Sequence, residues 1–334
     1  MRQRSHTLWR YREALPIADE ASIISLGEGM TPLVPFDAPA SDHRLKLDFV
    51  FPTGSYKDRG ASILLSKVRE LGVREVVEDS SGNAGAAIAA YSARAGIGCT
   101  VYCPAHTSKG KLAQIAMYGA KLKLIEGNRA ATTQAVLQAA EMTYYASHNW
   151  NPLFLEGTKT VAFEITEQLG WKAPDHVLCP VGFGSIYLGL YIGFRELYAQ
   201  KVIAKLPRLL GVQSAACCPI YKAYAENKGR IERSPQTYET LAEGITSELP
   251  IRAQMLMRAI HATNGAFAVV DENEIKAGVQ TLASKGIYVE PTSAVIVKAF
   301  DQFVADGIIG EGDLTVSILT GSGLKATDKL IKLV

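Results

Sequence analysis

The sequence has few cysteines, no long apolar run and no block of like charge. Its five cysteines lack the paired spacing of a zinc site, and their odd number argues against a disulfide framework. No apolar run is long enough to span a bilayer, and no apolar stretch follows the segment Met1 to His6. These absences predict a soluble, cytoplasmic protein with neither a secretion signal nor a metal site.

The charge balance excludes further classes of partner. The chain carries 35 basic and 33 acidic residues, which gives a formal net charge of +2 at pH 7. The basic residues are dispersed along the chain and form no run. We therefore expect neither nucleic acid nor an anionic membrane surface as a partner.

The chain is long and rich in apolar residues. Its 334 residues are 48% hydrophobic, enough for a large core in two domains or one large one. No shift in composition, low-complexity linker or internal repeat marks a domain boundary.

Predicted strands and helices alternate along most of the sequence. The strands are expected at 75–78, 99–102, 121–125, 144–146, 176–179, 208–212, 267–270 and 314–319. The helices are expected at 61–68, 83–95, 109–117, 130–142, 158–169, 186–198, 219–226, 251–263, 273–285, 292–306 and 325–333. Repeated β-α units predict an α/β fold with parallel sheets covered by helices on both faces. In such sheets a ligand binds beyond the carboxyl ends of the strands.

Lys57 lies in the segment Pro52 to Gly60, where small and hydroxylated residues precede the apolar helical run at 61–68. A lysine at the start of a helix opposes the helix dipole, so its position calls for a reason. In a cleft, desolvation favours the nucleophilic amine that binds an aldehyde cofactor as a Schiff base. A solvated surface lysine is the alternative, and this segment alone leaves both interpretations open.

Four junctions before predicted helices are rich in small or hydroxylated residues. They are Ser80-Ser81-Gly82-Asn83-Ala84-Gly85, Gly182-Phe183-Gly184-Ser185, Thr320-Gly321-Ser322-Gly323 and Glu290-Pro291-Thr292-Ser293. Backbone N–H groups at a helix start bind carboxylate or phosphate, and glycine lets the backbone approach the anion. Ordinary helix capping by Ser81, Asn83, Thr292 or Ser293 explains part of the same pattern. Each junction alone is weak evidence for a ligand site.

Lys57 and the junctions together suggest a Schiff-base lysine, a phosphate loop, an anion cradle and a neutral hydroxyl partner. On these residues the chain resembles the fold-type II pyridoxal-phosphate enzymes, and within them the threonine synthases. The supporting segments run in family order: Trp9-Arg10-Tyr11-Arg12, Gly27-Glu28-Gly29-Met30-Thr31-Pro32-Leu33, Thr53 to Gly60, Ser81-Gly82-Asn83, Leu155-Glu156-Gly157, Glu290-Pro291 and Leu319 to Lys325.

The resemblance implies a fold of the tryptophan synthase β type, with two three-layer α/β domains and mainly parallel sheets. It implies a smaller domain at 56–145, a larger domain made of 1–55 plus 146–334, and a pyridoxal-phosphate cleft between them. It also implies a small amino-acid substrate and, by analogy alone, a homodimer.

The resemblance also implies roles for single residues. Lys57 would bind the cofactor and then carry protons at the substrate's Cα, and Asn83 would hydrogen-bond the cofactor's phenolic oxygen. Backbone groups would hold the cofactor phosphate at Gly182, Phe183, Gly184, Ser185 and Ile186. The substrate's α-carboxylate would bind at Ser80, Ser81 and Gly82. Thr320 would contact the pyridine nitrogen; because a hydroxyl cannot stabilise a protonated pyridine as a carboxylate would, this favours elimination and replacement over transamination.

The sequence departs from threonine synthases where those enzymes bind the substrate's own phosphate. Ala84 replaces a usual threonine, Phe154 a usual arginine and Met30 a common asparagine. Phe154 cannot pair with a phosphate dianion, and the loss of a bidentate arginine removes the strongest kind of phosphate contact. The residues that could compensate are Arg59, Lys109, Lys111, His148 and Lys159.

Two reactions remain in view. The first is that of a carbon–oxygen lyase resembling threonine synthase, with γ-elimination and water addition on O-phosphohomoserine or a related O-activated amino acid. The second is β-elimination or β-replacement, as in threonine/serine ammonia-lyases or O-activated-serine synthases, which needs no clamp for a substrate phosphate. A catalytically silent homologue that binds the cofactor is a remote alternative. The order of the motifs favours the first reaction.

Overall fold

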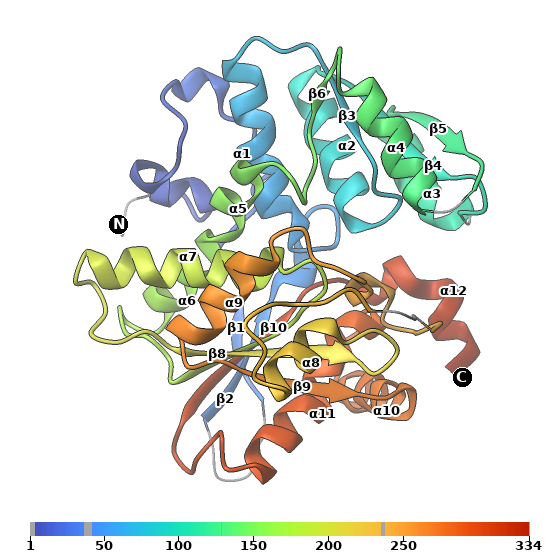
Figure 1. Cartoon of the computed structure of the whole chain (residues 1–334). Coiled ribbons are helices and arrows are strands. Elements are labelled where there is room, and N and C mark those ends of the chain that lie inside the picture. The colour runs from blue at the N-terminus through green and yellow to red at the C-terminus, as the bar shows by residue number, and fades with distance from the viewer. Residues whose placement is uncertain (1–3, 37–41, 108, 128, 235–237, 334) are drawn as a thin grey trace. The chain divides into compact units, whose positions relative to one another are not determined.

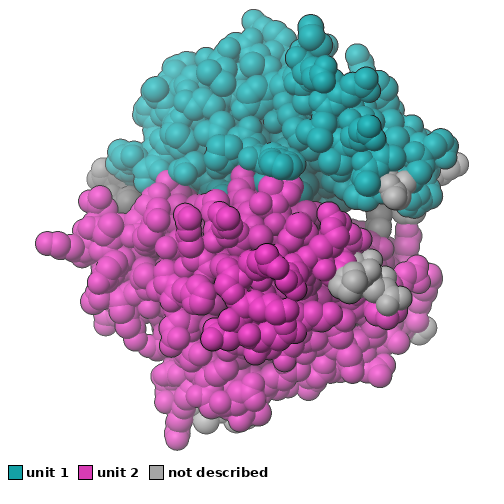
Figure 2. Space-filling model, in the orientation of Figure 1, with its two compact units in different colours: residues 1–30, 51–158 teal, residues 31–50, 159–334 magenta. Residues whose placement is uncertain are grey.

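The computed structural model describes residues 4–36, 42–107, 109–127, 129–234 and 238–333, and it forms two compact units. Unit 1 comprises Met1–Met30 and Phe51–Thr158, and unit 2 comprises Thr31–Val50 and Lys159–Val334 (Figure 2). Both units are α/β, as expected. The domain limits expected from the sequence, 56–145 against 1–55 plus 146–334, stay a prediction.

Unit 1 contains a parallel four-stranded sheet with the strand order β5-β4-β3-β6 (Figure 1). Its strands are β3 (Glu75–Glu78), β4 (Gly98–Pro104), β5 (Lys121–Ile125) and β6 (Tyr144–Tyr145). Its helices are α1 (Lys57–Glu70), α2 (Asn83–Ala95), α3 (Lys109–Met117), α4 (Arg129–Ala139) and α5 (Pro152–Thr158), with the 3-10 turns η1 (Leu8–Ala14) and η2 (Glu20–Ser22). Four alanines of α2 are buried in the core of this unit, where small side chains allow close packing of helix and sheet: Ala86, Ala87, Ala89 and Ala90.

Unit 2 contains a six-stranded sheet with the order β1-β2-β10-β7-β8-β9, in which only the β1–β2 pair is antiparallel. Its strands are β1 (Leu33–Pro35), β2 (Asp42–Leu47), β7 (His176–Pro180), β8 (Arg208–Ser214), β9 (Ala266–Val270) and β10 (Leu314–Leu319). Its helices are α6 (Thr160–Gln168), α7 (Ser185–Ala199), α8 (Pro219–Ala225), α9 (Ala253–Ala262), α10 (Glu272–Ser284), α11 (Pro291–Ala305) and α12 (Thr327–Leu330). Four 3-10 turns complete it: η3 (Asp48–Val50), η4 (Glu243–Ile245), η5 (Gly323–Ala326) and η6 (Ile331–Leu333).

Most predicted elements are confirmed, several with identical limits. The helix expected at 158–169 is confirmed as α6, whereas α5 was not predicted. One prediction is wrong in detail: the helix expected at 325–333 is α12 between two 3-10 turns. Strands β1 and β2 were not predicted. Strand β2 was not predicted because it lacks an apolar run and because two of its buried residues, His43 and Lys46, are polar. In the described part of the chain, none of the helices combines the length and the apolar character that crossing a membrane requires.

A buried ion pair explains the lysine within β2. Lys46 Nζ lies 2.8 Å from Glu164 Oε2 on α6, and both side chains are 0% exposed. The same ammonium donates to the Thr31 carbonyl oxygen at 2.7 Å and to Gln168 Oε1 at 2.9 Å. Several partners thus offset the cost of desolvating the lysine, and the pair joins β2 to α6.

A close helix contact in unit 1 holds the start of α1. A Cβ atom added to Gly157 on α5 would lie 2.0 Å from the Arg59 carbonyl oxygen, so the two backbones touch. A Cβ atom on Gly60 would lie 2.5 Å from the ring of Phe154. Two glycines, one on each helix, therefore permit this approach.

We expect Glu164→Ala to lower the free energy of unfolding by about 3–5 kcal/mol, because it leaves the Lys46 ammonium buried without its counter-ion. Chemical denaturation measures the change. Lys298→Ala, which breaks an exposed pair with Asp301, is the control and should cost less than about 1 kcal/mol. A similar loss in both variants would contradict the account.

We expect Gly157→Ala to separate α5 from α1 and to cost about 1–3 kcal/mol, as overpacking does. Thermal denaturation measures it. Gly229→Ala is the matched control, because a Cβ atom there meets nothing within 4 Å. An unchanged melting temperature for Gly157→Ala would show that the helix contact is not tight.

Candidate active site

Lys57 is the first residue of α1, and its side chain is half-buried. Its Nζ atom lies 4.6 Å from the centroid of the Tyr56 ring and 5.7 Å from that of the Phe154 ring. Both distances fall within the range of a cation–π contact. The amine therefore lies in an aromatic, partly desolvated environment rather than extended into solvent.

The loop before α1 is held by its own polar groups. Gly54 has a left-handed backbone with a φ of 82°, and its N–H donates to the Phe51 carbonyl oxygen at 2.7 Å. The Asp58 carboxylate accepts from the Thr53 N–H at 2.9 Å and from the Thr53 hydroxyl. Asp58 is fully buried, so this loop gives Lys57 a fixed starting point.

The segment 80–83 follows β3 and leads directly into α2. Gly82 is exposed and its neighbours are half-buried, so the segment is accessible. The helix begins at Asn83 with Gly82 in the capping position, so neither Ser81 nor Asn83 is the N-cap residue. The Gly82 N–H donates to Ser80 Oγ at 3.3 Å. A Cβ atom on Gly85 would lie 1.8 Å from the Ser80 carbonyl oxygen, which shows how tightly the segment folds over the helix start.

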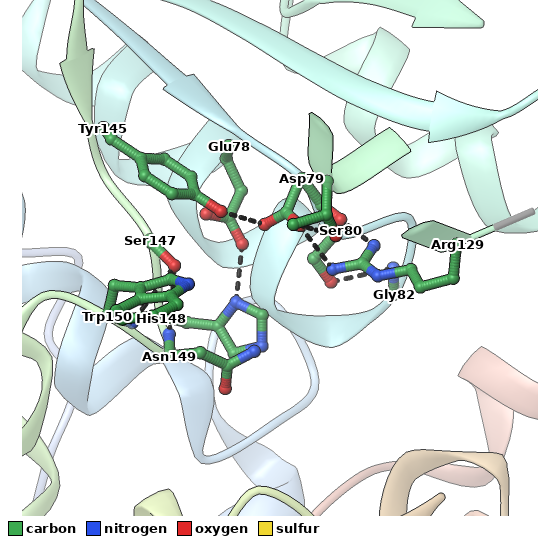
Figure 3. Close-up of polar contacts among 11 residues, drawn as sticks. Glu78, Asp79, Ser80, Gly82, Arg129, Tyr145, Ser147, His148, Asn149 and Trp150 are labelled. Atoms are coloured by element: carbon green, nitrogen blue, oxygen red, sulfur yellow. Dashed lines mark hydrogen bonds and ion pairs between the residues drawn. The ribbon is translucent and has the colours of Figure 1, made fainter. Parts of the chain in front are cut away.

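Asp79, directly before this segment, is the centre of a polar cluster (Figure 3). Its carboxylate accepts from Arg129 Nη2 at 2.7 Å and from Tyr145 Oη at 2.7 Å, with Thr133 Oγ1 at 3.3 Å. Arg129 also donates to the Asp79 backbone carbonyl. The cluster joins α4 and β6 to the segment 80–83, and it satisfies the charge of Asp79.

Glu78, the last residue of β3, is paired with His148 (Figure 3). Glu78 Oε1 lies 2.6 Å from His148 Nδ1, and the glutamate is 0% exposed. Burial, and then the charge of Asp79, raise the pKa of Glu78 well above its ordinary value. The sequence suggests His148 only as a possible phosphate partner and predicts no role for Glu78. Two consecutive acidic residues at the end of a buried strand were the available signal.

Two of the cations that the sequence offers as phosphate partners have contacts within their own units. The Arg59 side chain is fully buried, and its guanidinium carbon lies 4.8 Å from the centroid of the Phe51 ring. Lys159 Nζ lies 2.9 Å from Glu196 Oε1 in unit 2. The side chains of Lys109 and Lys111 lie outside the described residues.

In unit 2, the turn at Gly182, Phe183 and Gly184 joins β7 to the N-terminus of α7, which begins at Ser185 and Ile186. Gly184 has a φ of 86°, which favours glycine, and it is the capping residue of this 15-residue helix. A Cβ atom on Gly182 would lie 2.8 Å from the Ile245 Cα atom. The turn is therefore a compact backbone cradle with the positive end of a helix dipole.

Thr320, at the carboxyl end of β10, is held by Ser293 of α11. Ser293 Oγ lies 2.9 Å from Thr320 Oγ1 and accepts from the backbone N–H groups of Thr320 and Gly321, both at 2.9 Å. The N-cap of α11 is Glu290, so neither Thr292 nor Ser293 is the simple cap that the sequence allowed. Thr292 Oγ1 instead accepts from the Gly244 N–H at 3.1 Å. The contact by which Ser293 orients Thr320 is not predictable from the sequence, where the two residues lie far apart.

The predicted site residues thus fall into two sets. Unit 1 holds Lys57, Ser80, Ser81, Gly82 and Asn83, and unit 2 holds the turn 182–186 and Thr320. Among the residues whose placement is described, no three His, Cys, Asp or Glu side chains form a group that could hold a metal ion.

Comparison with known proteins identifies the relatives of this chain. The family described as "Pyridoxal-phosphate dependent enzyme" matches residues 24–321. The threonine synthase of Methanocaldococcus jannaschii is 38% identical over 99% of this chain and 84% of its own length. The threonine synthase of Halalkalibacterium halodurans is 36% identical over 95% of this chain and 89% of its own.

Solved structures share the fold at lower identity. The processed threonine deaminase isoform 2 of Solanum lycopersicum matches with a TM-score of 0.80 and 18% identity, covering 98% of this chain and 88% of that one. The maize serine racemase matches with a TM-score of 0.79 and 20% identity, covering 98% and 99%. These matches confirm the expected fold class, and the sequence relatives confirm the resemblance to threonine synthases. The chain belongs to the pyridoxal-phosphate-dependent enzyme family.

Proposed function

We propose that this protein is a pyridoxal-phosphate-dependent carbon–oxygen lyase that acts on an O-activated amino acid, as a threonine synthase does. The reaction would be γ-elimination followed by water addition, with O-phosphohomoserine or a related compound as the substrate. The half-buried amine of Lys57 at the start of α1 carries the proposal, because it is a nucleophile held beside aromatic rings. Near full-length similarity to threonine synthases supports it.

The residues fit the groups of the cofactor. The backbone cradle at 182–186 suits a phosphate group, since glycine leaves the backbone accessible and α7 contributes a favourable field. Asn83, at the start of α2, would hydrogen-bond the phenolic oxygen. The cofactor supplies an electron sink for the pair of electrons left at the substrate's Cα.

Thr320 would contact the pyridine nitrogen through a neutral hydroxyl. Ser293 fixes that hydroxyl at 2.9 Å, so the contact has a defined direction. A hydroxyl stabilises a protonated ring less than a carboxylate does, which favours loss of a substituent from Cβ or Cγ over transamination.

The segment Ser80, Ser81 and Gly82 would bind the substrate's α-carboxylate. These residues are accessible and lie at the N-terminus of α2, where the helix dipole stabilises a bound anion. Lys57, once released from the cofactor, would take the proton from Cα.

A second candidate reaction is β-elimination or β-replacement on serine or threonine derivatives. The specific observation is Phe154, which is fully buried and whose ring lies 5.7 Å from Lys57 Nζ. An aromatic ring there offers no hydrogen bond to a substrate phosphate. The homodimer and the cytoplasmic location expected from the sequence stay predictions, and a catalytically silent protein stays a remote alternative.

Borohydride reduction of the purified holoenzyme should attach the cofactor to Lys57, and peptide mass analysis should find it there. Lys57→Ala should lose the visible absorbance of the bound cofactor and at least about 10³-fold in turnover, as loss of a covalent nucleophile does. Lys67→Ala is the matched control on α1, where Lys67 pairs with Glu70. Cofactor attached to any lysine other than Lys57 would overturn the assignment.

The reaction products distinguish the two candidate reactions. We expect this protein to release phosphate and form threonine from O-phosphohomoserine. Its kcat/KM for that substrate should be at least about tenfold higher than for threonine or serine. Phosphate assays and amino-acid analysis measure both. Formation of 2-oxobutyrate from threonine, with no phosphate release from O-phosphohomoserine, would instead support the second candidate.

A further inference from the structure

Asp79 is a carboxylate that directly precedes the segment proposed to bind the substrate's α-carboxylate. It joins the end of β3 to Ser80, Ser81 and Gly82, and its side chain is only 4% exposed. A buried negative charge is weakly screened by water, so it would repel a second carboxylate bound beside it. Anion binding by this segment therefore requires that the charge of Asp79 be neutralised.

Arg129, the first residue of α4, contacts Asp79 through two of its nitrogen atoms (Figure 3). Nη2 donates to the Asp79 carboxylate at 2.7 Å, and Nη1 donates to the backbone carbonyl oxygen of the same residue. The planar guanidinium suits such a two-point contact, which an ammonium group does not reproduce. The Arg129 side chain is 47% exposed, so the ion pair joins a buried carboxylate to an accessible cation.

The contact with the carbonyl oxygen also orients the peptide group between Asp79 and Ser80. The described part of the chain contains no cis peptide bond, and in a planar trans peptide the C=O and N–H groups point in opposite directions. The Ser80 N–H therefore points away from Arg129. The Ser80 carbonyl oxygen lies against α2, where a Cβ atom on Gly85 would be 1.8 Å away. Arg129 and α2 thus fix the first two peptide groups of the segment.

The other partners of Asp79 are hydroxyl groups, which leave its charge in place. Tyr145 Oη donates at 2.7 Å and Thr133 Oγ1 at 3.3 Å. Burial, and then the charges of Asp79 and Glu78, raise the pKa of Tyr145, so its hydroxyl stays neutral. The charge of Arg129 also acts on Glu78, where it opposes the rise in pKa caused by burial and by Asp79. Arg129 therefore supplies the positive charge of this cluster.

We propose that Arg129 is a positioning residue for substrate binding: it neutralises Asp79, and the segment 80–82 can then hold the α-carboxylate of an amino acid. The inference rests on the carboxylate role given to that segment under the proposed function. It applies to both candidate reactions, because both act on amino acids. Arg129 acts through Asp79 and not by contact with the substrate.

The test compares the binding of L-threonine with that of L-threonine amide, which has no carboxylate. Visible absorbance of the holoenzyme follows both titrations. Arg129→Met should raise the Kd for threonine about 10–100-fold, because Asp79 then repels the carboxylate, and should change the Kd for the amide less than about threefold. With O-phosphohomoserine, KM should rise while kcat changes less than about threefold.

The double variant Asp79→Asn/Arg129→Met separates the effect of charge from that of structure. It removes both charges, so the Kd for threonine should return to within about threefold of the wild-type value. Asp79→Asn alone should bind threonine at least as tightly as the wild type. A purely structural Arg129 predicts instead that the double variant binds as poorly as Arg129→Met, or that both ligands are weakened equally. Either result would overturn the inference.

Arg94→Met is the matched control, because it removes the same charge from the last turn of α2, at the opposite end of that helix. It should leave both Kd values within about threefold of wild type. The melting temperature of each holoenzyme shows whether the variant folds. Should Arg129→Met not fold, Arg129→Lys replaces it: this variant keeps the charge, so a loss of threonine affinity of about tenfold or more would contradict the inference.

The binding test also separates the inference from the proposed function. No turnover of O-phosphohomoserine, together with the expected binding pattern, would contradict the proposed reaction alone. A wild-type holoenzyme that binds threonine no more tightly than its amide would refute the role of Arg129, whatever the reaction. If the holoenzyme binds neither ligand, the proposed function and the inference both fail.

Discussion

The contact between α1 and α5 is the constraint on which the candidate site of unit 1 depends. Gly157 brings the backbone of α5 against the Arg59 carbonyl oxygen, and Gly60 leaves room for the Phe154 ring. The same contact fixes the position of the first turn of α1, which begins at Lys57. It also fixes the position of α5, which follows His148 and Asn149 in the chain. A shift of one helix would therefore move the amine, the aromatic ring and the imidazole relative to one another.

The two acidic residues at the end of β3 differ because their partners differ. Asp79 has Arg129 and two hydroxyl donors, so its charge is compensated and it fixes the segment that leads into α2. Glu78 is fully buried, and its Oε1 atom lies 2.6 Å from His148 Nδ1. Two adjacent carboxyl groups cannot both be charged cheaply in a buried position. Asp79 therefore fixes local structure, and burial together with the charge of Asp79 raises the pKa of Glu78 well above its ordinary value.

Sequence patterns predicted the elements that local chemistry determines. The helix at 83–95 and the strand at 314–319 are confirmed with identical limits, because glycine punctuation and apolar runs define them. Strand β2 escaped prediction since its buried Lys46 depends on Glu164, far away in the chain. The same holds for Ser293 with Thr320 and for Glu78 with His148, whose partners meet only after folding. The predicted cofactor motifs are short local segments, whereas these side-chain pairs join residues that are distant in the sequence.

Phe154, at a position where the resemblance to threonine synthases implies an arginine, is part of the packing of unit 1. The Phe154 ring fills the space that Gly60 leaves, with no room for a Cβ atom between them. An arginine there would bury a guanidinium beside Lys57, and two like charges in a partly desolvated region repel each other unless an anion lies between them. A phosphorylated substrate would supply that anion, whereas an aromatic ring removes the need for it. The packing of Phe154 against Gly60 beside Lys57 thus needs no bound phosphate.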